Sequence, residues 1–517
     1  MKHIIYFCSI AFALIGGFTP AWGQHSTLNI FQQQQEAFLR QWNSSNNAAG
    51  LLLDRPTVQS FLEAGYSHAE GSYHRPQEAA KKTDAFLNTR GNIYLNRYYL
   101  EGYFSYQRSD VSGTQYNASL IDPFRGMPYL VADTNLSNWV HQDYKLGFKF
   151  SAPLRSDRWF LGMAADYQAT SGAKQRDIRA ENYFYSLTLR PSMVYHLNGS
   201  QSLGANLLYR SFKEESSNSN VNTYVDQKYY MLFGLGNTID YLGQGRTMNY
   251  TGEALGAGLQ YQYQGAVKFF LTADYRLQAE DAHIGFTSTR PLGTLLQENW
   301  TGRVNLQTTG GALGHVFDLA LDRTDSKGIE YITEFESGLE SDGYYIRYQS
   351  VRSTYRQQQA VFRYHIFKPD GHHYNWKAGI ETGWQQSADR YLIPESTMDL
   401  TQLHYGAQLE KLFRLSPKRN SYLSVGFNAK FRKHVEGEYN YQGPDGEEPT
   451  VRDLEARNFA YQRANLSHFA LPVTYSQRLK KRSSLQFFAR AVAGYTTSDH
   501  PLLKNRSTIH ISLGTTF

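Results

Sequence analysis

The sequence predicts an all-β fold: a transmembrane antiparallel β-barrel of roughly 18 strands, with roughly 16 to 20 possible, preceded by a short periplasmic helix. Three observations lead to this prediction. Many segments alternate apolar and polar residues, no long apolar run follows Phe18, and the mean hydropathy is only −0.54 although 15% of the residues are aromatic. Only helices and closed barrels satisfy their own backbone hydrogen bonds in hydrocarbon. Because membrane-spanning helices are excluded, the barrel remains.

The first 23 residues have the features of a secretory signal peptide. A basic start at Lys2 is followed by an apolar run over residues 4–18 and by the small residues Ala21 and Gly23. The only cysteine, Cys8, lies inside this run, so the predicted mature chain has no disulfide and no thiolate nucleophile. We expect a signal peptide at 1–23, a periplasmic N-terminal segment at 24–56 and the barrel at 57–517. A formal net charge of +6 on 517 residues does not indicate a nucleic-acid partner.

The N-terminal segment differs in composition from the rest of the chain. Residues 30–42 (IFQQQQEAFLRQW) are rich in helix formers, and the run of Asn and Ser at 43–47 ends the predicted helix. The segment is either a small plug or gate, or an ordered lead-in that packs against the base of the barrel; we favour the lead-in. It is too short to be the folded plug of a TonB-dependent transporter.

The remaining chain is predicted to consist of consecutive β-strands. Apolar residues alternate with polar ones over 269–277, 376–384 and 423–431, among other segments. These segments are roughly 10 to 14 residues long, as tilted membrane strands are, whereas ordinary strands centre on about 5 to 6. Charges stay on the polar face, because Arg or Lys on the lipid face costs about 2–4 kcal/mol at the midplane.

Connections alternate between short turns and long loops, the arrangement of outer-membrane barrels. Short turns are predicted at 151–158, 198–200, 264–266, 368–372, 415–420 and 480–483, and long loops at 109–138, 211–250, 324–353 and 434–462. The stretches 226–250 and 329–348 leave room for extra hairpins. An even number of strands places both termini in the periplasm.

The last strand has one apolar face, formed by Ile509, Ile511, Leu513 and Phe517, and one face of small polar residues. It resembles the closing strand of bacterial outer-membrane barrels, whose terminal Phe is part of the signal read by the barrel-assembly machinery. The resemblance implies a location in the cell outer membrane. It also implies that the assembly machinery, outer-membrane lipid and lipopolysaccharide are partners.

The order of segments resembles a known family. The stretch Trp42–Leu51 (WNSSNNAAGL), followed by a Tyr-rich barrel that ends in Phe, is similar to an uncharacterised family of Bacteroidota outer-membrane β-barrel proteins that carry a domain of unknown function. The resemblance covers the whole mature chain, and Asn-Asn-Ala-Ala-Gly-Leu is its only local signature. It implies no activity and no catalytic residue.

Charges on the polar faces are predicted to point into the lumen. They are Lys145, Lys149, Asp274, Arg276, Arg303, Asp318, Arg363, Lys377, Glu381, Lys430 and Arg490. Opposite charges on neighbouring strands brace a wide lumen, and rings of Arg or Lys select anions. Both interpretations stay open, and we favour bracing.

No residue is predicted to be catalytic, to bind a cofactor or to bind a metal. Pairs such as Asp281 with His283 bring a His near a carboxylate, but such pairs are common by chance, and His372-His373 has no further ligands at metal-binding spacing. We predict a channel or transporter that passes small polar solutes through a charged lumen. The alternatives are a non-conducting barrel that serves as an anchor or partner in a surface or secretion complex and, third, an outer-membrane hydrolase.

Overall fold

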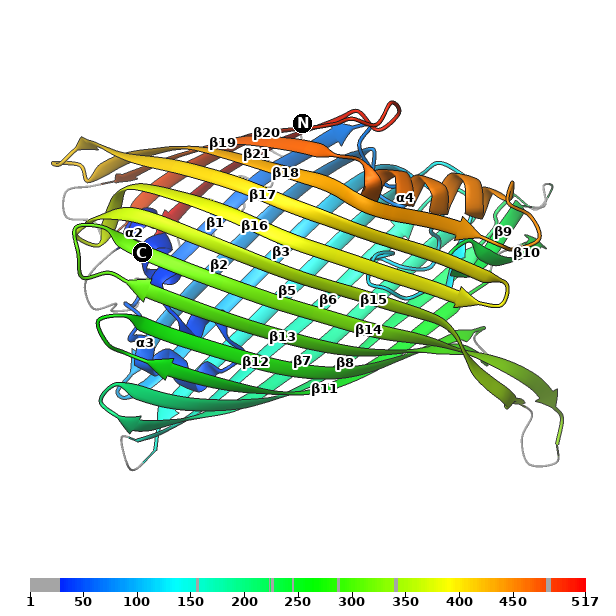
Figure 1. Ribbon diagram of the computed structural model, residues 1–517, viewed down its shortest axis with the longest axis horizontal. Coiled ribbons are helices and arrows are strands. Elements are labelled where there is room, and N and C mark those ends of the chain that lie inside the picture. The colour runs from blue at the N-terminus through cyan, green and yellow to red at the C-terminus, as the bar shows by residue number, and fades with distance from the viewer. Residues whose placement is uncertain are drawn as a thin grey trace.

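The computed structural model describes residues 28–517 except 155–157, 223, 225–226, 244–245, 286–288, 339–342 and 480–484. The predicted signal peptide lies outside these residues. The chain forms an 18-stranded antiparallel sheet that closes because β1 pairs with both β2 and β21 (Figure 1). The predicted fold class and strand number are confirmed. The barrel strands are β1 (Ser60–Gly71), β2 (Lys81–Leu95), β3 (Tyr98–Thr114), β5 (Ser137–Pro153), β6 (Trp159–Lys174), β7 (Arg179–Asn198), β8 (Gln201–Ser219), β11 (Met248–Tyr263), β12 (Lys268–Ile284), β13 (Arg290–Thr308), β14 (Gly314–Glu336), β15 (Gly343–Asp370), β16 (His373–Leu392), β17 (Glu395–Ser416), β18 (Ser421–Tyr441), β19 (Leu466–Arg478), β20 (Gln486–Ser498) and β21 (Asn505–Thr516).

The pairing of β1 with β21, which closes the barrel, shows which face of the last strand is outside. Leu513 lies opposite Ala64 of β1, and the backbones of Ser60 and Phe517 exchange two hydrogen bonds of 3.0 Å. Ile509, Ile511, Leu513 and Phe517 are each about half exposed on the outer face. Ser512, on the other face, is buried and donates a 2.6 Å hydrogen bond to Glu63. The alternation in the sequence therefore corresponds to the two faces of the barrel wall.

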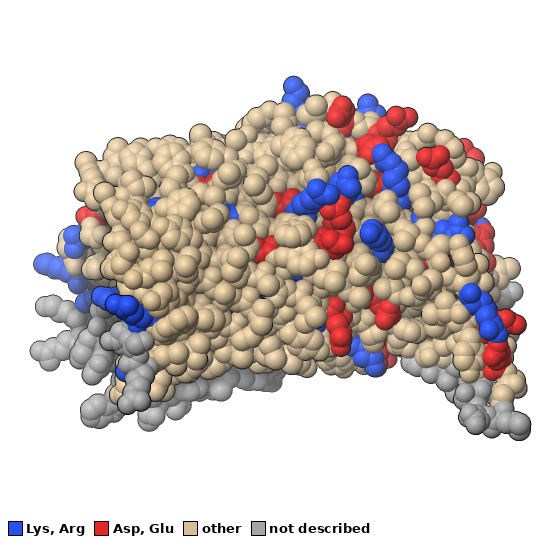
Figure 2. Space-filling model, turned by 60° about the horizontal axis from the view of Figure 1, so that its bottom comes forward, with Lys and Arg blue, Asp and Glu red and all other residues tan. Residues whose placement is uncertain are grey.

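The outer surface has two zones. On the face shown in Figure 2, the zone nearer the short turns is largely free of charged side chains, whereas charges crowd the other zone. On β14 the exposed Phe317, Leu319 and Leu321 are followed by Arg323, which pairs with Asp325 at 2.6 Å. An uncharged belt bordered by charged residues is typical of a barrel wall in which the belt contacts lipid and the charged zone contacts water.

The long loops are shorter than predicted, because several strands continue beyond the uncharged belt. β8 runs to Ser219, β18 runs to Tyr441, and β14 and β15 remain paired up to Glu336 and Gly343. In the extensions of β14 and β15 most residues on both faces are exposed, so the apolar alternation that identifies a membrane strand is missing. In the extension of β8 the buried face carries polar residues, Glu214 and Ser216. Both suspected hairpins exist, but neither adds a barrel strand. One continues β14–β15 (Figure 1), and the other forms part of a separate inner sheet.

The inner sheet contains β4 (Leu130–Ala132), β9 (Gln227–Gly234) and β10 (Asn237–Gly243). It packs in an apolar cluster that includes Tyr129, Met231 and the inward-facing Tyr250 of β11. A π-helical turn, η3 (Thr450–Glu455), leads into α4 (Ala456–Arg463) at the same end (Figure 1). Chain from three long connections therefore folds over and into one mouth of the barrel.

The N-terminal segment lies at the opposite end (Figure 1) and contains α2 (Ile30–Leu39), η1 (Trp42–Ser44), η2 (Ala48–Gly50) and α3 (Leu51–Asp54). The predicted helix is present, and it ends at Leu39. Asn29 caps α2 through reciprocal hydrogen bonds with Gln32. None of the helices in the described part of the chain is long and apolar enough to cross a membrane.

Candidate functional site: the lumen and its two occupied ends

The N-terminal segment docks on the inner face of the barrel wall through η2. The Ser151 hydroxyl of β5 donates a 2.9 Å hydrogen bond to the Ala49 carbonyl, and the Ala49 N–H donates one of 3.2 Å to Ser192 Oγ of β7. Gly162 of β6 lies between them, where a Cβ atom would come within 2.2 Å of the Ala49 nitrogen. Only glycine allows the segment to approach the wall this closely.

Trp42 and Asn47 extend this contact to β8 and β11. Trp42 is fully buried, donates a 2.7 Å hydrogen bond from Nε1 to Gln262 and meets Phe270 edge-on at 4.9 Å between ring centroids. The Asn47 amide lies 2.8 Å from Gln260 Oε1 and 3.1 Å from the Ala205 carbonyl oxygen. Side-chain amides of the wall thus meet polar atoms of the segment, and the aromatic ring fills the space between them.

The other end of the lumen is held by a buried cluster of charges. Arg125, from the connection before β4, forms ion pairs with Glu214 of β8 and, at 2.7 Å, with Glu280 of β12. Both carboxylates are almost completely buried, and the guanidinium also lies over the Tyr250 ring, 4.9 Å from its centroid. The Tyr250 hydroxyl donates a 2.9 Å hydrogen bond to the Tyr129 carbonyl. These contacts tie the inner sheet to the barrel wall.

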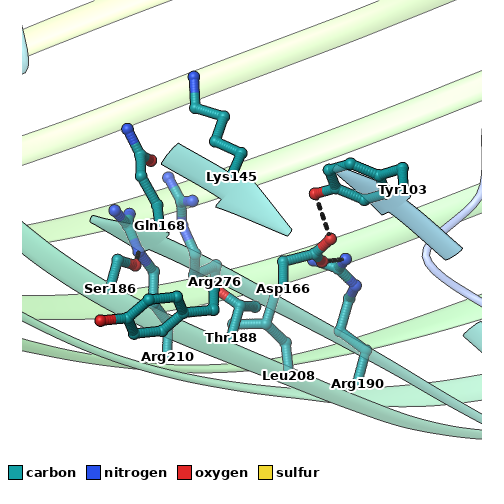
Figure 3. Close-up of a pocket in the computed structure, with 11 residues that line it drawn as sticks. Tyr103, Lys145, Asp166, Gln168, Ser186, Thr188, Arg190, Leu208, Arg210 and Arg276 are labelled. Carbon is teal, nitrogen blue, oxygen red and sulfur yellow. Dashed lines mark hydrogen bonds and ion pairs between the residues drawn. The ribbon is translucent and has the colours of Figure 1, made fainter. Parts of the chain in front are cut away.

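A cavity of about 250 Å³ lies in the lumen between these two regions. The order of contacts along two strands places it there. On β8, Ala205 contacts the N-terminal segment, Arg210 lines the cavity and Glu214 pairs with Arg125; on β12 the same order is Asp274, Arg276, Glu280. The cavity is lined by Tyr103, Lys145, Asp166, Tyr167, Gln168, Ser186, Thr188, Leu208, Arg190, Arg210 and Arg276 (Figure 3).

Four basic side chains and one carboxylate line this cavity. Asp166 pairs with Arg190 and accepts a 2.7 Å hydrogen bond from the Tyr103 hydroxyl (Figure 3). Arg210 Nε donates a 3.0 Å hydrogen bond to Ser186 Oγ. Arg276 has no hydrogen-bond or ion-pair partner among the described residues, and its Nε is buried. Lys145 pairs with Asp143 at 2.9 Å, so Arg210 and Arg276 are the basic groups of this cavity that have no carboxylate partner among the described residues.

The structure gives the predicted lumenal charges different surroundings, and most of them form ion pairs. Lys149 pairs with Glu101 at 3.2 Å, Arg363 with Glu381 at 2.6 Å and Asp318 at 3.5 Å, Lys377 with Glu410 at 3.5 Å, and Arg490 with Glu63 at 3.3 Å. Pairs of this kind brace neighbouring strands. Lys145 and Arg276 line the cavity; Lys145 also pairs with Asp143 at 2.9 Å, whereas Arg276 has no such partner among the described residues.

Two further members of the set touch the N-terminal segment. Asp274 accepts a 3.2 Å hydrogen bond from Asn46, and Arg303 donates one of 3.4 Å to the Ser44 carbonyl. The last, Lys430, lies opposite Gly406 and is exposed. 

Asp166, Arg190 and Arg210 also line the lumen, although they are not among the charges predicted to do so. Each alternates along its strand with exposed apolar neighbours such as Leu187 and Tyr209, so the same parity argument would have found them.

A second cavity, of about 460 Å³, lies between the N-terminal segment and the turn from β15 to β16. Glu36 and Arg40 form an ion pair beside it, and burial raises the pKa of Asp54 to about 7 although Arg40 opposes this shift. The two ring nitrogens of His373 bond the Asp370 carbonyl and the Tyr422 hydroxyl, which explains this turn histidine structurally. Within the described ranges, no three His, Cys, Asp or Glu side chains are grouped so that they could hold a metal ion.

Comparison with known proteins places the chain in a family. The profile of a family of unknown function (DUF6850) matches residues 48–517, so the chain belongs to this family. No curated protein matches the sequence.

Several solved structures are similar over most of their length. The FrpB iron transporter from Neisseria meningitidis is 9% identical, with 91% of this chain and 83% of that chain covered and a TM-score of 0.42. BauA, the ferric preacinetobactin receptor from Acinetobacter baumannii, is 11% identical, with 89% and 80% covered and a TM-score of 0.39. The outer membrane transporter YddB from Escherichia coli is 9% identical, with 88% and 80% covered and a TM-score of 0.38.

Proposed function

We propose that this family member is a gated outer-membrane transporter for small polar solutes, and that residues 28–57 are its periplasmic gate. The observation that carries the proposal is the charged cavity in the lumen, which lies between the N-terminal segment and the inner sheet. A barrel of this strand number is wide enough to hold an aqueous path when folded chain does not fill it. The cavity is the part of that path that remains between the two filled ends.

The N-terminal segment is the better candidate for the moving part. It leads into β1 only at its C-terminal side, so its release breaks no strand pairing of the barrel. Its contacts with the wall include hydrogen bonds from Asn47 and Ala49 that water can replace at about 0.5–1.5 kcal/mol each. The inner sheet, in contrast, belongs to connections that are tied to barrel strands at both ends.

The proposal includes insertion into the outer membrane, with the N-terminal segment on the periplasmic side. The uncharged belt in Figure 2 and the outward Ile511 and Leu513 support insertion into an outer membrane. Short turns and the C-terminal Phe517 lie at the same end as α2, the end that we assign to the periplasm (Figure 1). Assembly by the barrel-assembly machinery, contact with lipopolysaccharide and an origin in the Bacteroidota remain predictions.

A reversible covalent lock tests the gate. Ser192 Oγ lies 3.2 Å from the Ala49 nitrogen, so a double variant, Ala49→Cys with Ser192→Cys, brings two thiols to adjacent positions in a mature chain that otherwise has no cysteine. We expect solute flux into liposomes, and single-channel openings in a planar bilayer, to disappear on oxidation and to return on reduction. The two single-cysteine variants, treated identically, are the controls.

Equal flux from the oxidised and reduced double variant would mean that the segment is not the gate. Absence of flux from the folded wild-type chain and from the reduced variant would favour the second function, a non-conducting anchor or partner. One observation specifically favours that alternative: folded chain occupies both ends of the lumen. No observation favours the hydrolase, and the non-enzymatic reading remains a prediction.

A further inference from the structure

We propose that Arg210 and Arg276 form a binding site for the oxyanion group of a solute: a phosphate, a sulfate or a carboxylate. The inference builds on the proposed function because it names the solute class, but binding itself requires no transport. The site occupies the lumenal cavity and uses two strands, β8 and β12, that flank β11. Figure 3 shows both guanidinium groups reaching into the same space, together with the Lys145 ammonium and the Gln168 amide.

The strand register brings the two arginines together. Gly256 of β11 lies opposite Leu208 on one side and opposite Arg276 on the other, and Ala254 lies opposite Arg210. Both inward residues of β11 at this level are small. Because no large side chain of β11 stands between the two arginines, both guanidinium groups can extend into the cavity.

The carboxylates on the inner faces of these two strands have other partners. Asp274, two residues before Arg276, accepts a 3.2 Å hydrogen bond from Asn46 and forms no ion pair with Arg276 among the described residues. Glu214 follows Arg210 on β8 and Glu280 follows Arg276 on β12, and both pair with Arg125. Within the cavity, Asp166 is engaged by Arg190. Positive charge is therefore left in excess at Arg210 and Arg276.

A bound oxyanion would relieve this excess. Half-buried like charges repel one another in a medium of reduced dielectric, and an anion between them converts that repulsion into attraction. Guanidinium groups are planar forks of N–H donors that match two oxygens of a carboxylate, phosphate or sulfate. Ser186, Thr188 and Gln168 add hydroxyl and amide groups that suit the remaining oxygens of such a ligand.

Other arginines in the lumen differ from Arg276 because they are paired with carboxylates. Arg363 lies between two carboxylates, and Arg490 is paired with Glu63. In the described residues, Arg276 has no such partner although its Nε is shielded from water. An arginine that only braced the wall would sit beside a carboxylate on a neighbouring strand.

Calorimetric titration of the full mature chain, folded in detergent, tests the site. Inorganic phosphate, sulfate and succinate are titrated separately at constant ionic strength, with chloride as the background anion. We expect at least one of the three to bind, and its affinity to fall at least tenfold in Arg276→Gln and in Arg210→Gln. Lys430→Gln is the matched control, since it removes one positive charge on the inner face of β18, outside the cavity, and should leave the affinity unchanged.

Arg276→Lys keeps the positive charge but loses the planar guanidinium donors, so we expect a partial loss of anion affinity. It also serves as the test if Arg276→Gln does not fold. Equal affinity in wild type and in the arginine variants would overturn the site, and so would a folded wild-type chain that binds none of the three anions. Anion binding without flux in the cysteine-lock experiment would remove the transport proposal and leave the site standing. Flux without anion binding would do the reverse.

Discussion

The two ends of the lumen are filled in different ways, and the difference bears on which end can open. At the end with short turns, a single stretch of chain docks through hydrogen bonds and a few buried rings, led by Trp42 and Phe31. At the other end, connections between strands fold into a large apolar cluster that is fastened by the ion pairs of Arg125. The first can leave as one unit, whereas the second can leave only by unfolding. Of the two ends of the lumen, the end filled by the N-terminal segment is therefore the one that can open without unfolding of the barrel connections.

Removing the charge of Arg125 should show the largest effect and would establish that the inner sheet is fixed. Arg125→Met leaves Glu214 and Glu280 buried without a counter-charge, which we expect to destabilise this end by about 3–5 kcal/mol. Hydrogen exchange of residues 229–232, measured against the rest of the barrel, reports the change.

Glu280→Gln is the matched variant, because it leaves Arg125 and Glu214 as a one-to-one pair. Its cost should be clearly smaller. If both variants exchange as slowly as the wild type, the ion pairs do not hold the sheet, and the contrast between the two ends loses its basis.

Truncation of Trp42 tests the opposite end. Trp42→Ala removes a fully buried ring and its hydrogen bond to Gln262, a change that typically costs about 3–5 kcal/mol. Because the segment can undock, we expect the loss to appear locally, as protease sensitivity within residues 28–57 and as more frequent channel openings. The melting temperature of the barrel should change little.

Ser45→Ala is the control, since Ser45 Oγ donates to the Trp42 carbonyl and accepts from the Asn47 N–H, and both partners lie within the segment. A large fall in barrel stability with Trp42→Ala, without local exposure of the segment, would show that the segment is a structural part of the wall.

The smallest expected effect is a pH dependence at the fixed end. Burial raises the pKa of Glu455, in the π-helical turn before α4, to about 7, although the Asn458 side chain and the Gly236 backbone donate hydrogen bonds to it and oppose the rise. The folded form therefore favours the protonated acid. The contribution to stability is complete below the ordinary glutamate pKa and is lost as the pH rises through about 7.

After division by the intrinsic exchange rate at each pH, we expect hydrogen exchange across residues 450–463 to quicken between pH 5 and pH 8 by an amount equivalent to about 1–3 kcal/mol. Glu455→Gln should abolish this dependence, whereas Glu438→Gln, at an exposed position, should retain it. An unchanged pH dependence in Glu455→Gln would assign the titration to another group.

Much of the barrel was predictable because its signal is local. A period of two, read within one strand, is enough to place Ile511 outside and Ser512 inside, and the same parity argument listed Lys145 and Arg276 among the lumenal charges. The strand extensions at 329–336 and 343–351 were missed, since water on both faces removes the alternation.

The function of the lumenal charges was not predictable, because it depends on which partners lie across the barrel. Arg363 and Arg276 look alike in sequence, yet one lies between carboxylates on neighbouring strands and the other has none. The docking of the N-terminal segment likewise joins Asn47 to Gln260, 213 positions away. Its short polar sequence carried no sign of that contact.

The sequence by itself determined the class of fold and the strand number to within one or two hairpins, because both follow from periodicity within single strands. The tertiary structure decided which ends of the lumen are filled, which charges are neutralised and where a basic cavity remains. Those outcomes depend on strand register and on loops that fold inward. Both are set by contacts between residues far apart in the chain, such as Arg125 with Glu280.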